Sequence, residues 1–190
     1  IAIPDADWTP EMFAGVTAEL PTQLQIARRL AQQGCLVVVP MLISRDSKYS
    51  GNPEIRMTNQ PHREFLYRQS FQLGRHVIGY EIQKILSAVD ILEPYLHPQE
   101  SNIASIPIGV VGIGEGGLLA FYASALDARI QATLISGYFE KRDGLWKEPI
   151  YRNVWSLLTE FGDSDIASLI APRQLTIEAC SAVNIAGPPE

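Results

Sequence analysis

The sequence contains little that points to disulfide chemistry or to a membrane span. Only two cysteines, Cys35 and Cys180, occur among 190 residues, and neither lies in a C-x-x-C pair. Two cysteines at this spacing are too few for a disulfide framework. The longest apolar runs, such as Cys35 to Leu42, fall far short of the roughly 20 residues that span a bilayer. We therefore expect no transmembrane helix.

Long basic tracts are also missing from the sequence. It holds 15 Lys and Arg against 21 Asp and Glu, which gives a formal net charge of -6. Because nothing in this balance would attract a phosphate backbone, we expect no nucleic-acid binding. None of the 3 histidines has the spacing of a metal-ligand pair, and we expect neither a metal nor another cofactor.

Strand and helix patterns alternate along the chain. Short apolar, β-branched runs predict strands at 1–3, 35–40, 106–111, 132–136 and 175–179. Apolar residues at helical spacing predict helices at 21–33, 63–73, 76–95 and 116–126. This order is typical of an α/β fold with a mostly parallel, doubly wound sheet and helices on both faces. We treat 1–190 as a single domain with a polar excursion at about 44–63.

The most informative segment is the glycine turn Gly112 to Gly117, which joins the strand at 106–111 to the helix at 116–126. As G-x-G-x-x-G it would be a dinucleotide-binding fingerprint, with backbone N–H groups that face a pyrophosphate at a helix N-terminus. As G-x-Nu-x-G it would be the nucleophile elbow of an α/β-hydrolase, with Gly114 in the position of the catalytic serine. The two interpretations imply different chemistry.

The residues around the turn favour the elbow. A dinucleotide fingerprint wants an acidic residue at the end of the next strand, but that strand ends in Ser136-Gly137, and Glu140 follows only later. An elbow needs small residues two positions before and two after its centre, as Gly112 and Gly116 supply. Its centre is strained, and glycine reaches positive φ at little steric cost. The dinucleotide site remains the second alternative.

Further segments of the chain match the surroundings of such an elbow. They are Leu73 to Asp90, Asp127 to Ile130, Gly144 to Trp146, Pro149 to Arg152, and Asp165 to Arg173 with its I-A-P-R motif. Together with the glycine turn they resemble the α/β-hydrolases of the acetylxylan esterase and dienelactone hydrolase groups. The resemblance implies a carboxylic ester hydrolase that works with a nucleophile, an acid and a base histidine.

The catalytic positions that the resemblance implies are incomplete. The nucleophile position is Gly114, which has no group to attack an acyl carbon. The acid would follow the strand at 175–179, where Glu178 is the nearest carboxylate. The base histidine would follow one more strand, and the chain stops at Glu190 before such a strand. We therefore predict a catalytically degenerate esterase-like domain, with an active esterase that uses Ser136 or a serine at 44–50 as the alternative.

The resemblance also implies an oxyanion hole. One N–H would come from Glu115, and a second from the loop after the first strand, where Asp5, Ala6 and Asp7 are donor candidates beside Trp8. Because two aspartates would oppose an anion, we expect a neutral partner, a small-molecule ester or carbohydrate. Trp146 is a candidate platform for such a ligand. Packing over the sheet is the favoured interpretation of the aromatic residues Trp146, Tyr151, Trp155 and Phe161.

The sequence also suggests roles for three ionisable residues. Glu115 could act as an acid or base, since a helix N-terminus stabilises a carboxylate. His76 is predicted to be structural at a helix start, and His62 to be a loop residue.

The chain begins at Ile1, in what resembles the second half of a buried strand. We therefore expect a partial α/β-hydrolase fold that is truncated at both ends.

Overall fold

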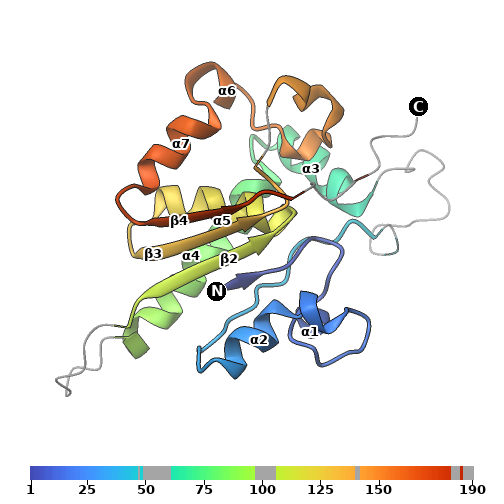
Figure 1. Ribbon diagram of the computed structural model, residues 1–190. Coiled ribbons are helices and arrows are strands. Elements are labelled where there is room, and N and C mark those ends of the chain that lie inside the picture. Colours follow the sequence, from blue (N-terminus) through green and yellow to red (C-terminus); the bar gives the residue numbers. More distant parts are fainter. Residues whose placement is uncertain (47, 49–60, 97–105, 140–141, 181–184, 186–190) are drawn as a thin grey trace.

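The sheet of the protein consists of parallel strands in the order in which they occur along the chain. In the computed structural model, which describes residues 1–46, 48, 61–96, 106–139, 142–180 and 185, Figure 1 shows the sheet at the centre. The strands are β1 (Ala2–Ile3), β2 (Ile108–Ile113), β3 (Ile130–Ser136) and β4 (Gln174–Glu178). Each neighbouring pair is parallel. The predicted α/β class is confirmed, while most of the polar excursion at 44–63, and Glu140, lie outside the described residues.

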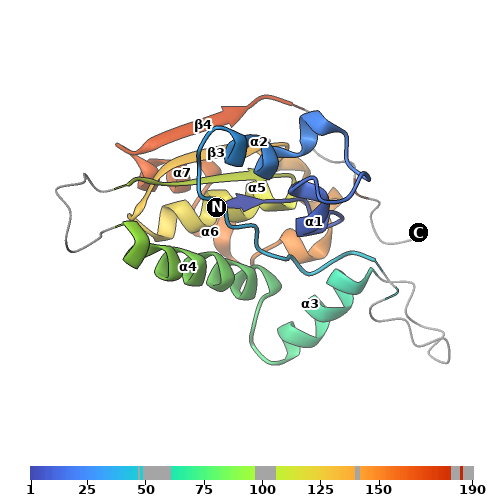
Figure 2. The ribbon, with the colours of Figure 1, turned by 90° about the horizontal axis from the view of Figure 1, so that it is seen from below.

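One face of the sheet carries the main core. Its helices are α3 (His62–Gln72), α4 (Val77–Leu96), α5 (Glu115–Leu126) and α7 (Asp163–Ile170). Figure 2 shows α4, α5 and α7 on the same side of the strands. Helix α5 is apolar on nearly all sides because it contacts β2 and β3 on one side and α4 and α7 on the others. The position of α5, and with it the end of the glycine turn, is therefore fixed from several directions.

Among the described residues, helices cover the opposite face at the β1 end. There α1 (Pro10–Phe13), the 3₁₀ turn η1 (Thr22–Leu24) and α2 (Ile26–Gln32) form a second apolar cluster with Ala2 and Val111. On β3 and β4 the same face leaves Leu134 and its register partner Thr176 exposed. Helices thus lie on both faces, as predicted, but the cover is unequal.

Two predicted elements differ from the structure. The helix expected at 21–33 is divided into η1 and the shorter α2, with Gly34 in the left-handed conformation after it. The strand expected at 35–40 is an extended segment without a regular ladder, although the Ala2 N–H donates to the Val38 carbonyl at 2.9 Å. Its neighbour β1 has only two residues, too few to organise a ladder along the whole run. The other predicted helices and strands agree within two residues.

The I-A-P-R motif has a structural role at the far end of α5. Arg173 Nη1 donates to the carbonyl oxygens of Ser124, Asp127 and Ile130, and Nη2 donates to that of Leu169. The last carbonyls of a helix have no partner within the helix, and a basic side chain can satisfy them. Arg173 therefore ties the end of α5 to the turn between α7 and β4.

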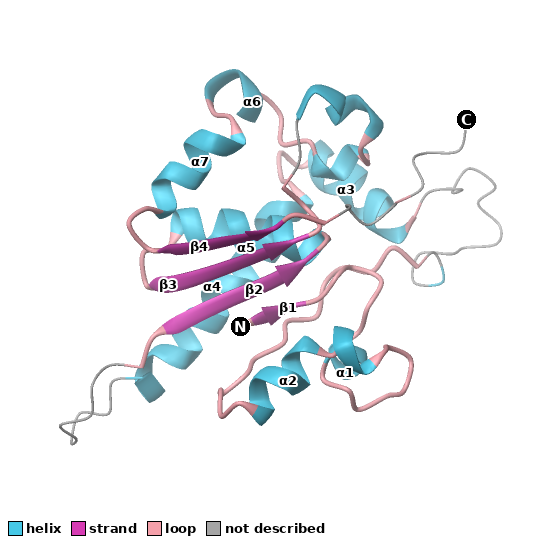
Figure 3. Cartoon of the chain, in the orientation of Figure 1, coloured by secondary structure: helices cyan, strands magenta, loops and turns pink. Residues whose placement is uncertain are grey.

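The segment between β3 and α7 lies above the carboxyl edge of the sheet. It contains the 3₁₀ turns η3 (Arg142–Lys147) and η4 (Ile150–Arg152) and the short helix α6 (Leu157–Glu160). Figure 3 shows these turns beside α3, on the side of the sheet to which β2 and β3 point. Within the described ranges, no helix is both long and apolar enough to cross a membrane.

Candidate active site

The glycine turn has the geometry of an elbow. Gly114 lies between β2 and α5 with φ 58° and ψ −116°, so the predicted positive φ is confirmed. Its N–H donates to the Ser136 carbonyl at 2.8 Å. A Cβ added to Gly112 would lie 2.0 Å from the Gly116 carbonyl oxygen, and one added to Gly116 would lie 2.3 Å from the Ile3 carbonyl oxygen. Both flanking glycines are therefore required by the close approach of backbones.

The loop after β1 reaches the elbow, as expected, but it presents a hydrogen-bond acceptor there instead of a donor. Asp5 is 1% exposed, and its Oδ2 accepts the Glu115 N–H at 3.0 Å. Its Oδ1 accepts the Asp7 N–H at 3.2 Å. Asp5 thus contributes a carboxylate acceptor at the place where a backbone donor was expected. The Glu115 N–H, the predicted oxyanion-hole donor, is already bound by the protein itself.

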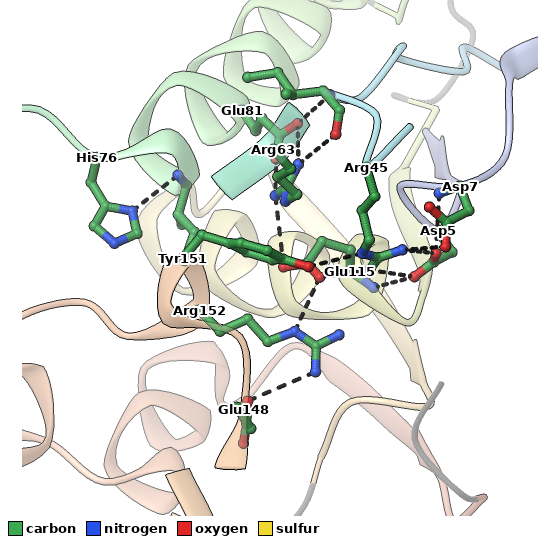
Figure 4. A network of polar contacts seen from close by, with 12 residues as sticks. Asp5, Asp7, Arg45, Arg63, His76, Glu81, Glu115, Glu148, Tyr151 and Arg152 are labelled. Atoms are coloured by element: carbon green, nitrogen blue, oxygen red, sulfur yellow. Dashed lines mark hydrogen bonds and ion pairs between the residues drawn. The ribbon is translucent and has the colours of Figure 1, made fainter. Parts of the chain in front are cut away.

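Arg45 holds this carboxylate. Its Nη1 lies 2.5 Å from Asp5 Oδ1 and 2.9 Å from Asp7 Oδ2. Its Nη2 lies 3.3 Å from Asp5 Oδ2 and 2.9 Å from Glu115 Oε2, and Nε donates to the Tyr151 hydroxyl at 2.9 Å (Figure 4). Burial alone would raise the pKa of Asp5, but the hydrogen bond and positive charge of Arg45 hold it below its ordinary value.

Glu115 is surrounded by arginines. Its side chain is fully buried, and Oε2 accepts from Arg45 Nη2 and from Arg152 Nε at 3.0 Å. Oε1 lies 3.6 Å from Arg63 Nη2. A substrate would have to displace these cations to exchange a proton with the carboxylate. This arrangement speaks against the acid or base role that the helix N-terminus suggested for Glu115.

A second buried pair extends the network to α4. Arg63 pairs through both Nη atoms with the carboxylate of Glu81, and Arg63 Nη1 also donates to the Ile43 carbonyl at 3.0 Å. Glu81 Oε1 accepts the Ile43 N–H at 2.7 Å. Charged side chains that are this deeply buried are almost always paired. We call the six side chains Arg45, Arg63, Arg152, Asp5, Glu81 and Glu115 the arginine cluster.

The other predicted site residues lie apart from this cluster or at its rim. Glu178 ends β4 opposite Ser136 and is exposed. Ala6 is buried and Asp7 is exposed, while Trp8 is half-buried with its ring 6.0 Å from that of Phe13. These positions leave the roles proposed for Glu178 and Ala6 as predictions.

The predicted packing of the aromatic residues is largely wrong. Trp146 is 80% exposed, Trp155 is 79% exposed and Phe161 is also exposed, whereas Tyr151 alone is buried. Tyr151 is buried because its hydroxyl accepts from Arg45 and its ring lies 5.1 Å from the Arg63 guanidinium carbon. The tryptophans lie on the short turns above the sheet, where no described helix covers them. Trp146 therefore remains a candidate ligand platform.

His76 and Ser136 have structural partners. His76 Nδ1 accepts the Ile78 N–H at 3.1 Å at the start of α4, so its predicted place at a helix start is confirmed. Burial lowers the pKa of His76. Ser136 Oγ lies 3.5 Å from Cys180 Sγ. His62, expected in a loop, instead begins α3. In the part of the chain that the structure describes, no cluster of His, Cys, Asp and Glu suits a metal ion.

Sequence reasoning missed four members of the cluster, Arg45, Arg63, Glu81 and Arg152. One signal was present for Glu81, because it falls on the buried stripe of α4 between Ile78 and Ile85. A carboxylate on an apolar stripe needs a buried partner. No comparable pattern marks the arginines, which are 18 to 70 residues away from the carboxylates that they pair with inside the cluster.

Comparisons with known proteins confirm the resemblance to the dienelactone hydrolase and acetylxylan esterase groups. The sequence pattern of the dienelactone hydrolase family matches residues 10–165. The chain is 31% identical over 114 residues to the "Putative hydrolase YtaP" of Bacillus subtilis (strain 168). The aligned region covers 57% of this chain and 36% of that protein. A crystal structure described as a "putative acetyl xylan esterase" from Bacteroides fragilis superposes with a TM-score of 0.67 at 16% identity and covers 93% of this chain and 50% of that one. The chain thus spans about a third to a half of these two proteins.

Proposed function

The chain belongs to the dienelactone hydrolase family, and we propose that its domain keeps the hydrolase fold without forming an acyl-enzyme at the elbow. The observation that carries the proposal is Gly114, which occupies the elbow position with the strained backbone but has no side chain. Acyl transfer of this type begins with attack by a side-chain nucleophile. In its absence the remaining parts of the site can bind a ligand but cannot open its ester bond.

The ligand that we propose is a small neutral ester or carbohydrate. Asp7 lies beside the elbow, and its carboxylate is exposed. It can accept hydrogen bonds from the hydroxyl groups of a ligand, and its charge repels anions. Trp146 presents an exposed ring on the turn above the sheet. The similarity to a protein described as an acetyl xylan esterase supports this ligand class.

An ester-hydrolysis assay tests the absence of turnover. We expect the full chain to hydrolyse p-nitrophenyl acetate at the rate of a buffer blank, with no burst of nitrophenolate at high protein concentration. The matched variants replace each alternative nucleophile with alanine in turn: Ser136→Ala, Ser44→Ala, Ser47→Ala and Ser50→Ala. Turnover that is lost in one variant and kept in the others would identify an active esterase and overturn the proposal.

A dinucleotide site is the remaining alternative at the glycine turn. Such a site needs free N–H groups at the start of α5 to face a pyrophosphate. The Glu115 N–H is bound by Asp5, and a carboxylate at this place repels phosphate. We therefore expect no thermal stabilisation by millimolar NAD or NADP. A saturable rise in the melting midpoint would favour the dinucleotide site instead.

A further inference from the structure

The elbow and Arg45 together have the donor set of a carboxylate-binding site. The Asp5 carboxylate receives four donors: the Glu115 N–H, the Asp7 N–H and two guanidinium nitrogens of Arg45. A guanidinium that faces both oxygens, combined with backbone N–H groups, is the arrangement by which proteins bind free carboxylates. Here every one of these donors is turned toward a side chain of the same molecule.

The burial of this contact shows that it is not a chance surface pair. The side chains of Asp5 and Arg45 are 2% and 7% exposed. The two residues are 40 positions apart, and Asp5 is 110 positions from Glu115. The contact therefore joins three segments, the loop after β1, the segment before α3 and the start of α5, at the position where an ester carbonyl would meet the elbow N–H.

We propose that the elbow retains a carboxylate-binding site and that Asp5 is its built-in ligand. The native chain fills the position of the oxyanion with its own carboxylate, and Arg45 is the positioning residue that keeps it there. An external ligand of the native protein consequently binds without the Glu115 N–H. When the Asp5 carboxylate is removed, the same N–H donors bind a free carboxylate of matching size. This inference holds whether or not the domain turns over esters.

Chemical rescue of Asp5→Ala tests the proposal. The substitution deletes one carboxylate group, and formate has the size and charge to replace it. We expect Asp5→Ala to lower the melting midpoint by about 6 to 20 °C, as is typical when a buried pair is broken in a domain of this size. Formate at about 100 times its Kd should recover roughly 5 to 10 °C of that loss with a saturable dose response.

Two matched variants separate rescue from a general salt effect. Asp5→Asn keeps the site filled with a neutral group, so formate should not recover its stability. Asp127→Ala removes a carboxylate that also meets an arginine and a backbone N–H, but around the half-exposed Arg129. Formate should have little effect there, because water already competes for those donors. Equal recovery in all three variants, or none in Asp5→Ala, would overturn the proposal.

The wild-type chain supplies a measurement that does not depend on the folding of a variant. In an acid titration followed by NMR, the Glu115 amide proton shift should follow the protonation of the Asp5 carboxyl, because that N–H donates to it. Arg45 contacts this carboxyl directly, and the carboxylates of Asp7 and Glu115 bind the same guanidinium. A Glu115 amide that does not move while Asp5 titrates would show that the carboxylate is not its ligand. An ester-hydrolysis assay has no bearing on this result, so failure here is distinguishable from failure of the proposed function.

Discussion

The two ends of α5 carry similar sets of charges in different surroundings. At the N-terminal end Arg45 meets Asp5, Asp7 and Glu115. At the C-terminal end the half-exposed Arg129 meets three carboxylates, each with a nitrogen-to-oxygen distance of 2.7 Å. These carboxylates are Asp90, Glu93 and Asp127. The first set is buried except for Asp7, whereas in the second set Arg129, Asp90 and Glu93 are all open to solvent.

The difference shows that burial, rather than the number of ion pairs, determines what a charge cluster does. A surface pair adds little stability because water screens it and competes for its donors. A buried pair costs desolvation but cannot lose one partner without leaving an uncompensated charge. We therefore expect the Arg45 set to fix the geometry of the elbow, and changes in the Arg129 set to have little effect on the fold.

Loss of the buried guanidinium should have the largest effect. Arg45→Met leaves Asp5 without its cation and removes one of the cations around Glu115. We expect the free energy of unfolding to fall by about 3 to 5 kcal/mol. Urea denaturation followed by circular dichroism measures this change. A loss smaller than that of Arg129→Met would refute the distinction between the two ends of α5.

A side chain at the elbow should have the next largest effect. Gly114→Ser places a non-glycine residue at φ 58°, a strain that costs on the order of 1 to 3 kcal/mol. Gly79→Ser is the matched control, because Gly79 lies in α4 and a Cβ added there would have open space around it. Serine is a better helix former than glycine, so the control should be neutral or slightly stabilising. Equal stability of both variants and the wild type would mean that Gly114 is not strained.

Acid should weaken the N-terminal end of α5 through Asp5. The pKa of its carboxyl is lowered in the folded protein, so the unfolded chain binds the proton more readily. The stability that Asp5 contributes is thus present above its unfolded pKa of about 3.8, and it is lost as the pH falls through the lower folded value. The stability difference between wild type and Asp5→Asn should narrow below about pH 3.8, as measured by urea midpoints across pH. A difference that widens in acid would contradict this sign.

Substitution in the Arg129 set should have the smallest effect on stability. Arg129→Met is expected to change the free energy of unfolding by less than about 1 kcal/mol, because its guanidinium is already in contact with water. The change should shrink further in high salt, which screens exposed charges more than buried ones. Urea denaturation at low and high salt measures both. A large, salt-independent loss would show that this set acts like the buried one.

The parts of the fold that are determined by residues close together in the sequence were predictable. The elbow follows from an apolar run, glycines at two fixed positions and a helical pattern, all within residues 106–126. The resemblance to the hydrolase groups implied that the loop after β1 lies near the elbow, and the Asp5 contact with the Glu115 N–H agrees with this. The strand predicted at 35–40 failed because its ladder depends on a partner that has only two residues.

The chemistry around the elbow was not predictable in the same way. Asp5 was expected to offer its N–H, but its side-chain contacts with the Glu115 N–H and with Arg45 show that it offers a carboxylate. That contact, and those of Arg63 and Arg152, join distant segments and follow no periodic pattern. Aromatic residues were expected to pack, but burial on a loop depends on which segments cover it, as the exposed Trp146 shows.

We propose that the elbow of this hydrolase-family chain has no nucleophile. Incubation of the full chain with a fluorophosphonate probe, followed by intact-mass spectrometry and peptide mapping, tests it directly. The predicted result is an unchanged mass under conditions that label a serine esterase completely. A stoichiometric adduct on a single serine, such as Ser136, would contradict the claim and identify the nucleophile.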